Sequence, residues 1–291
     1  MANNRLIVDE RQRDLGNFMV GRLLPFRKKR QVGPFTFIDH MGPSKIGPEK
    51  YLDVDQHPHI GLSTLTYLIS GAIHHKDSMG SDQIIYPGEV GFMTSGKGVT
   101  HTERTPENMR RGQNHMVQGY QIWVALPEKL EYMEPVFQYL KSTEVPEWVE
   151  LDCKIRLVAG KAFGRKSKIE GYSEMFMLDV LALKDTVISL EEKLRGEVAF
   201  VVVKGEIEID GESIQKGQML ISKTNEMCSL DITKGTQVLL FGGKPLAKEP
   251  LLLWNFVSSD KERLKQAKQD WINRKFPVVP SDSTYIPFPN T

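Results

Sequence analysis

The sequence has little cysteine and no excess of charge of either sign. Two cysteines in 291 residues exclude a disulfide-dense secreted scaffold. Lys and Arg together number 38 and Asp and Glu number 37, for a formal net charge of +1. Direct nucleic-acid binding and anionic-membrane binding usually need a basic excess, so this balance argues against both. Cys153 and Cys228 have no Cys or His neighbour, and we expect both to be small buried side chains.

Long apolar runs are also missing. No stretch reaches the roughly 18 residues of a membrane span. The N-terminal sequence MANNRLIVDERQRD is polar and charged, unlike a secretory or transit leader. We therefore expect a folded cytoplasmic protein.

Two short motifs suggest binding functions that we do not expect. The basic run FRKKR at 26–30 favours a solvated turn over a nucleic-acid patch. The segment GFMTSGKG at 91–98 is not a phosphate-binding loop, because Gly98 occupies the required Ser/Thr position.

Histidine is missing from the whole second half of the sequence. All seven histidines lie between His40 and His115, and none follows. Any chemistry that depends on imidazole is therefore confined to the first half of the chain.

Short strand-like segments dominate the chain. They are rich in β-branched and aromatic residues and are bounded by Gly, Pro or Asp. Examples are 62–69 (LSTLTYLI), 83–86, 117–126 (VQGYQIWVAL) and 154–158. Turn signals recur about every 8–15 residues without long helices between them, which predicts an all-β antiparallel sandwich or barrel.

The second half repeats the pattern of the first. Residues 199–205 (AFVVVKG) resemble 65–71 (LTYLISG), and in each half a hairpin and a Gly-led strand follow. We predict two tandem antiparallel β-barrels, one over 1–135 and one over 136–291, the second including a C-terminal helix over 258–274 and an extended, Pro-rich tail.

Two short motifs carry the chemistry. His57 and His59 are two residues apart, as are His101 and Glu103. Side chains at i and i+2 of a strand point the same way, so neighbouring strands would bring three imidazoles and one carboxylate to one point. This donor set suits a divalent metal: Fe, Mn, Ni, Cu or Zn.

The remaining histidines give weaker signals. His74 and His75 follow a turn, and we expect a solvated hairpin position, with contact to the metal site by one of them as the alternative. We expect His40 and His115 to be structural or loop residues.

Residues 57–103 resemble the signature of the pirin family. They match HPHxGxxTxTY, HxDS, PGxV and MTxGxGxxH, followed by Thr-Glu, and the resemblance extends through PFTFIDHMGP at 34–43 and YQIWVALP at 120–127. It implies a bicupin whose N-terminal barrel alone carries a metal, usually iron, held by His57, His59, His101 and Glu103.

The resemblance also implies two alternative functions. Some pirins show quercetin 2,3-dioxygenase activity, so one expectation is an Fe(II) enzyme acting on a flavonol or another aromatic or enediol substrate and O₂. In this reading Glu103 is the catalytic proton acceptor. Eukaryotic members act as transcriptional coregulators, so the alternative is a redox-sensitive metal-binding regulator of a partner protein.

Alignment of the two halves predicts a second barrel without metal. Offsets measured from Gly71 place Glu191 and Lys193 where His57 and His59 stand. Offsets measured from Gly88 place Leu230 and Ile232 where His101 and Glu103 stand. These residues do not form a donor set, so we expect the second barrel to serve packing.

Overall fold

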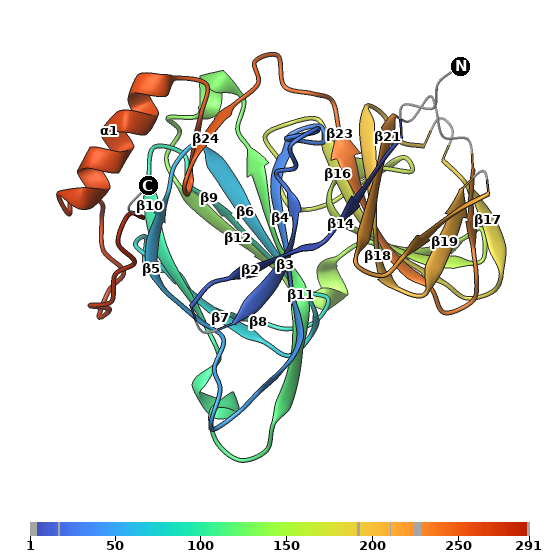
Figure 1. Cartoon of the computed structure of the whole chain (residues 1–291), viewed down its shortest axis with the longest axis horizontal. Coiled ribbons are helices and arrows are strands. Elements are labelled where there is room, and N and C mark those ends of the chain that lie inside the picture. The colour runs from blue at the N-terminus through green and yellow to red at the C-terminus, as the bar shows by residue number, and fades with distance from the viewer. Residues whose placement is uncertain (1–4, 17, 191–192, 210, 224–228, 290–291) are drawn as a thin grey trace. The chain divides into compact units, whose positions relative to one another are not determined.

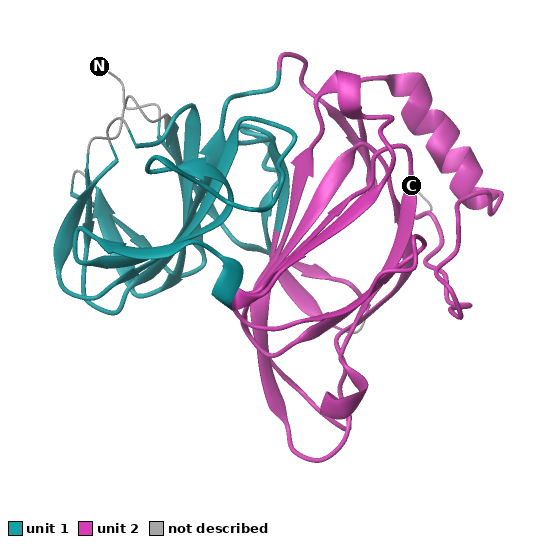
Figure 2. Cartoon of the chain, turned by 180° about the vertical axis from the view of Figure 1, so that it is seen from behind, with its two compact units in different colours: residues 1–11, 21–38, 143–246 teal, residues 12–20, 39–142, 247–291 magenta. Residues whose placement is uncertain are grey.

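The computed structural model describes residues 5–16, 18–190, 193–209, 211–223 and 229–289. Its strands are joined by short turns, with one α-helix near the C-terminus (Figure 1). Cys228 and Glu191 lie outside the described residues. Contacts divide the chain into unit 1, which comprises 1–11, 21–38 and 143–246, and unit 2, which comprises 12–20, 39–142 and 247–291 (Figure 2).

Unit 2 contains every histidine of the chain. Its strands form a four-stranded sheet in the order β5-β10-β7-β8, a second sheet that includes β12-β9-β6-β11, and the hairpin β24-β25. Their bounds are β5 Asp53–His59, β6 Leu62–Ser70, β7 Ile73–Asp77, β8 Asp82–Ile85, β9 Val90–Thr94, β10 Val99–Arg104, β11 His115–Ala125, β12 Val136–Leu140, β24 Leu251–Leu253 and β25 Phe256–Ser258. Short 3₁₀ turns lie at η1 Glu107–Met109 and η2 Glu128–Leu130.

Unit 1 repeats this plan with a second four-stranded sheet, β17-β22-β19-β20, and a larger sheet in the order β1-β21-β18-β23-β16-β14-β13, with β15 beside β14. The bounds are β1 Leu6–Asp9, β13 Glu147–Glu150, β14 Cys153–Ala162, β15 Arg165–Lys166, β16 Met175–Ala182, β17 Thr186–Ser189, β18 Glu197–Lys204, β19 Glu206–Ile209, β20 Glu212–Gln215, β21 Gln218–Lys223, β22 Ser229–Ile232 and β23 Gln237–Gly243. β2 Arg11–Asp14, β3 Met19–Leu24, β4 Phe35–Ile46 and η3 Ser142–Glu144 have residues in both units.

The expected all-β fold of two similar domains is confirmed. Each unit is a sandwich of antiparallel sheets, and within the described ranges the strands do not close into a ring. Both expected features of the second half, the strand over 199–205 and its hairpin, fall within β18 to β20. Cys153 is buried in the apolar interior of unit 1, as expected for an inert thiol.

The units do not coincide with the ranges 1–135 and 136–291. β12 lies beyond residue 135 but pairs with β9, so it extends a sheet of unit 2. The two ends of the chain are exchanged between the expected domains. The N-terminal β1 pairs with β21 in unit 1, and the C-terminal residues 247–291 belong to unit 2. Strand pairing and tail docking are long-range contacts, and neither leaves a local signal in the sequence.

The helix α1 spans Lys261–Ile272, within the expected 258–274. Asp260 is its N-cap and accepts a hydrogen bond from the backbone N–H of Glu262. Leu264, Ala267 and Trp271 are buried at the spacing of three and four residues that predicted it. α1 is too short and too polar to cross a membrane, and the described part of the chain has no other α-helix.

A tight turn at Gly96 precedes β10. Gly96 has φ +45°, and a Cβ there would lie 2.0 Å from the carbonyl oxygen of Met133. Glycine is thus required both by the backbone conformation and by the close approach. Because a strand and not a helix follows this turn, residues 91–98 do not form a phosphate-binding loop.

Candidate metal centre

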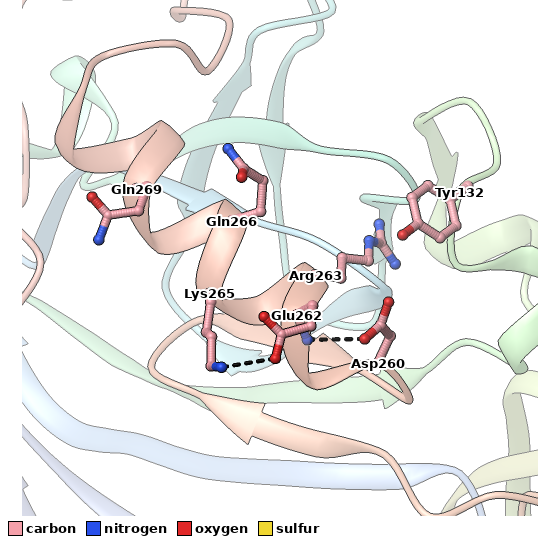
Figure 3. Close-up of a pocket in the computed structure, with 7 residues that line it drawn as sticks. All are labelled: Tyr132, Asp260, Glu262, Arg263, Lys265, Gln266 and Gln269. Atoms are coloured by element: carbon pink, nitrogen blue, oxygen red, sulfur yellow. Dashed lines mark hydrogen bonds and ion pairs between the residues drawn. The ribbon is translucent and has the colours of Figure 1, made fainter.

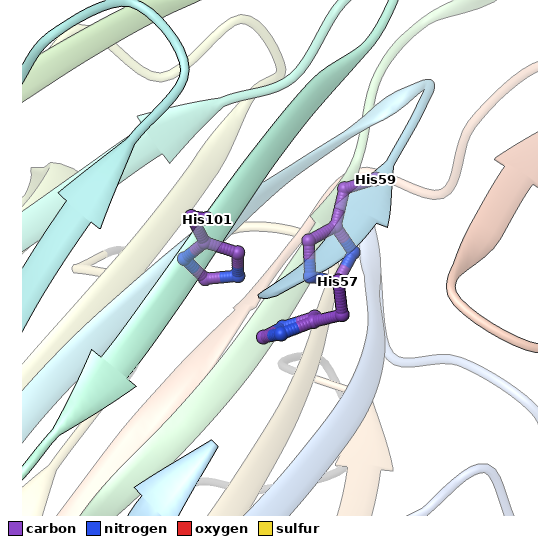
Figure 4. A group of neighbouring side chains, drawn as sticks. All are labelled: His57, His59 and His101. Atoms are coloured by element: carbon purple, nitrogen blue, oxygen red, sulfur yellow. The ribbon is translucent and has the colours of Figure 1, made fainter. Parts of the chain in front are cut away.

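Strands β5 and β10 bring three histidines together. His57 and His101 are direct partners in the antiparallel pairing, and His59 lies two residues further along β5 on the same face. The possible ligand nitrogens of these three residues lie within 4.8 Å of one another (Figure 4). Their exposed fractions are only 6%, 1% and 0% for His57, His59 and His101. The predicted same-face arrangement of the imidazoles is therefore present.

Backbone carbonyls orient two of the rings. His57 Nδ1 lies 2.8 Å from the carbonyl oxygen of Asp55, and His59 Nδ1 lies 3.1 Å from that of Asn255. A carbonyl oxygen only accepts hydrogen bonds, so each Nδ1 must carry the proton. The Nε2 lone pair of each ring is consequently left available.

The buried nitrogens fit a metal. Nε2 of His59 and Nε2 of His101 are buried without any hydrogen-bond partner, and an unpaired buried polar atom is costly unless something binds it. Burial lowers the pKa of all three imidazoles, to about 4 for His57. The rings are therefore neutral near pH 7, as ligation requires.

Glu103 is beside this group but outside it. The β5–β10 pairing shifts register between His101 and Glu103, so Glu103 is opposite Val54 of β5 and not Asp55. On β10 itself the two residues keep their i, i+2 spacing, because the pairing with β7 is regular there. The Glu103 carboxylate is buried and accepts a hydrogen bond of 3.2 Å from the Thr66 hydroxyl. Burial raises the pKa of Glu103. Among the described residues, the ligand atoms that lie within 4.8 Å of one another belong to His57, His59 and His101.

The two histidines of β7 take different positions. His74 is partly exposed and pairs with Asp82, 2.5 Å from Nε2 to the carboxylate, so the expected hairpin position is right for it. For His75 that expectation was wrong, because its side chain is only 2% exposed and its Nδ1 lies 3.3 Å from Nδ1 of His101. The alternation of a strand explains the difference, since neighbouring residues face opposite sides.

The remaining candidates make other contacts. His40 stacks on Tyr120 with ring centroids 4.7 Å apart, and His115 begins β11. The basic run at 26–30 forms a turn closed by backbone bonds between Phe26 and Lys29, and Lys29 forms an ion pair with Glu197. These positions agree with the structural roles expected from the sequence.

The C-terminal segment holds the two strands that carry the histidines. Gln56, next to His57, accepts a hydrogen bond from the N–H of Val279 (2.7 Å) and donates one to the carbonyl of Thr284 (2.9 Å). Arg104, at the end of β10, forms an ion pair of 2.8 Å with Asp282. The tail, shown in red beside β5 and β10 in Figure 1, is therefore docked and not free.

A surface hollow of about 340 Å³ lies beside α1 (Figure 3). Two of its charged groups form a pair, Lys265 with Glu262 at 2.7 Å, and Arg263 pairs at 3.1 Å with Glu131, which does not line the hollow. Asp260 caps the helix. Because these charges are already neutralised, the hollow does not present a converging set of groups for a ligand.

Several residues around the site were not identified from the sequence. Asn255, Gln56 and Thr66 contact the site or its strands through pairings that only the folded chain reveals. His75 and Asp77 did leave a signal, because they repeat the i, i+2 spacing of the two metal motifs on a neighbouring strand.

The two β-sandwiches, one with a buried histidine cluster, define a protein of two cupin domains. The family model named Pirin matches residues 17–124, and the model of the pirin C-terminal cupin domain matches residues 177–277. The chain belongs to the pirin family.

Known relatives resemble the chain over most of its length. A pirin-like protein of Caulobacter vibrioides is 42% identical over 288 residues, which cover 98% of this chain and 99% of the relative. A Pseudomonas aeruginosa protein named "Putative quercetin 2,3-dioxygenase" is 32% identical over 257 residues, which cover 88% and 79%. The crystal structure of quercetin 2,3-dioxygenase from Acinetobacter baumannii has a TM-score of 0.90 and 29% identity, and covers 99% of this chain and 95% of that one.

Proposed function

We propose that this protein is a metal-dependent dioxygenase of the quercetin 2,3-dioxygenase type, with Fe(II) held by Nε2 of His57, His59 and His101. The observation that carries the proposal is the pair of buried, unpartnered Nε2 atoms beside a third imidazole. The similarity to proteins bearing the dioxygenase name supports the choice of reaction. When bound, the metal would supply a Lewis-acidic, redox-active centre at which a flavonol and O₂ meet.

Glu103 is the proton acceptor in this proposal. A carboxylate whose pKa is raised by burial takes a proton more readily near neutral pH than an exposed one. Its position beside the imidazoles allows it to take the proton of a substrate hydroxyl, while the Thr66 hydroxyl holds one oxygen in place. The assignment of Glu103 as a fourth metal ligand stays a prediction.

Burial controls access to this site. Among the three histidines His57 retains the largest exposed fraction, 6%, and Glu103 retains 7%. Trp123 packs edge-on against His59 with ring centroids 5.1 Å apart. An aromatic substrate would thus meet an apolar wall and a nearly dry proton acceptor, which strengthens electrostatic interactions with a substrate.

Oxygen uptake with quercetin tests the proposal. We expect iron-loaded protein to consume O₂ only when quercetin is present, and Glu103→Gln to lower kcat about 100- to 10,000-fold. Retained iron in Glu103→Gln would assign Glu103 to proton transfer, and lost iron would assign it to ligation. Glu107→Gln, on exposed η1, is the control. No quercetin-dependent uptake by the iron-loaded parent would contradict the dioxygenase proposal.

The native metal is a separate question. Elemental analysis of protein purified without a histidine tag would distinguish Fe from Mn, Ni, Cu and Zn, all of which accept imidazole ligands. The regulatory alternative, the protein partner and the cytoplasmic location stay predictions. Equal partner binding by Fe(II) and Fe(III) forms would exclude redox-dependent recognition.

A further inference from the structure

A buried chain of three side chains leads away from the histidine cluster. His101 Nδ1 lies 3.3 Å from His75 Nδ1, and His75 Nε2 lies 3.1 Å from the Asp77 carboxylate. The exposed fractions of these residues are 0%, 2% and 0%. Strand pairing fixes the chain, because β10 runs beside β7 with His101 opposite Asp77.

The partners of each atom determine where the protons lie. The Asp77 carboxylate also accepts the backbone N–H groups of Met79 and Ser81, so it acts as an acceptor throughout. His75 must therefore donate from Nε2 and accept at Nδ1. His101 must then donate from its Nδ1, which leaves its Nε2 lone pair directed at the cluster.

His101 differs in this respect from the other two histidines. The Nδ1 atoms of His57 and His59 face backbone carbonyls, whose role as acceptors cannot change. The partner of His101 is another imidazole, which can donate or accept. The ring plane of His75 is held by stacking on Phe137, with centroids 4.5 Å apart, but stacking does not choose its tautomer.

We propose that Asp77, acting through His75, is the positioning group that keeps the His101 Nε2 lone pair facing the metal site. This inference rests on the metal site of the proposed function and concerns its preorganisation. His75 and Asp77 do not touch the metal in this arrangement. Groups of this kind typically change metal affinity 10- to 100-fold when they are altered.

The variant Asp77→Asn is expected to reverse the direction of the two hydrogen bonds that link Asp77, His75 and His101. The backbone N–H groups of Met79 and Ser81 hold an oxygen at Oδ1, so the new amide nitrogen faces His75. His75 would then accept at Nε2 and donate from Nδ1, and His101 would carry its proton on Nε2. We expect the dissociation constant for Co²⁺, measured by competition with a chelator, to rise 10- to 100-fold.

The chain contains a matched control. Asp82 of β8 pairs with His74, which neighbours His75 on β7 but points to the opposite, more exposed face. Asp82→Asn changes the same chemical group and is expected to leave the Co²⁺ dissociation constant within twofold of the parent value. Long-range ¹H–¹⁵N spectra of the metal-free proteins report directly which nitrogen of His101 is protonated. We expect Nδ1–H in the parent and Asp82→Asn, and Nε2–H in Asp77→Asn.

The outcomes separate the inference from the proposed function. If the parent does not bind Co²⁺, the metal site itself is refuted. If the parent binds and Asp77→Asn binds equally well, or His101 keeps Nδ1–H in that variant, the positioning role is overturned. Should Asp77→Asn fail to fold, His75→Leu removes the acceptor of His101 and is expected to weaken Co²⁺ binding at least tenfold; unchanged binding would overturn the inference.

Discussion

The two four-stranded sheets share their strand order but differ in the side chains that they bury. The order is β5-β10-β7-β8 in unit 2 and β17-β22-β19-β20 in unit 1. In unit 2 His101 is paired with His57, and at the corresponding place in unit 1 Leu230 is paired with Ile188. Equivalent backbones therefore carry imidazoles in one unit and aliphatic side chains in the other.

The correspondence continues along the central strands. Glu103 is opposite His75 in unit 2, and Ile232 is opposite Ile207 in unit 1. Leu190, two residues after Ile188, takes the place of His59. These five residues of unit 1 are all nearly fully buried. Leu230 and Ile232 are the residues that the sequence offsets indicated, whereas the offsets for the other strand missed the aliphatic pair.

This difference separates what the fold supplies from what the side chains supply. The core cluster of unit 1 is built from apolar side chains, whose burial favours folding without a bound group. The interior of unit 2 keeps buried nitrogens that lack partners within the protein, and such atoms reduce stability until something binds them. The sandwich is the common scaffold, and the metal preference resides in a few inward-facing positions.

The largest expected effect comes from making unit 2 resemble unit 1. In His101→Leu one of three imidazoles is lost, so we expect Co²⁺ affinity to fall about a thousandfold, or about 4 kcal/mol. The metal-free protein should unfold at an equal or higher urea concentration, because an unpartnered buried nitrogen is removed. A calorimetric titration and a urea melt measure both quantities. Unchanged affinity would show that this position is not a ligand.

The reverse exchange tests whether unit 1 tolerates a polar interior. Leu230→His buries an imidazole where every described neighbour in the cluster is apolar. We expect the free energy of unfolding to fall by about 3 kcal/mol, from the lost apolar contact and the unpaired nitrogens. Urea denaturation measures this, with Leu230→Met as the size-matched control. A loss below 1 kcal/mol would mean that the interior of unit 1 is more adaptable than its packing indicates.

Acid should destabilise the metal-free protein through unit 2, since unit 1 contains no histidine. The pKa of His57 is about 4 in the fold and about 6.5 in an unfolded chain. Between these values only the unfolded chain binds the proton, so stability falls as pH drops from 6.5 to 4, by up to about 3 kcal/mol. The urea midpoints measured at pH 7 and at pH 4.5 should differ less for His57→Leu than for the parent. An equal pH dependence in both proteins would contradict the shifted pKa.

A smaller effect is expected from releasing the tail of unit 2. Gln56→Leu removes the side-chain hydrogen bonds to Val279 and Thr284, and we expect a loss of about 2 kcal/mol in stability. Limited proteolysis should then cut within residues 279–286 faster than in the parent. Gln118→Leu, on β11, is the matched control and should leave the cleavage rate of the tail unchanged. Equal cleavage of the Gln56 variant would show that the tail is held by other contacts.

The parts predicted from the sequence are those with a short repeat. The i, i+2 spacing of His57 and His59 gave the shared face, and the spacing of Leu264, Ala267 and Trp271 gave the helix. Long-range partners were beyond reach: nothing near Asn255 in the sequence indicates that its carbonyl orients His59. The pairing of the chain ends could not be predicted from the sequence for the same reason, because the pattern of an edge strand does not identify its partner.

The exchanged chain ends also set an order of events during synthesis. A nascent chain that ends at residue 142 already contains His57, His59 and His101, but it lacks the carbonyl of Asn255 that orients His59. It also lacks the tail residues that hold Gln56. The histidine cluster therefore reaches its final hydrogen-bonded form only after the whole of unit 1 has been translated. A metal bound by the cluster in this form would therefore bind after Asn255 and the tail have been made.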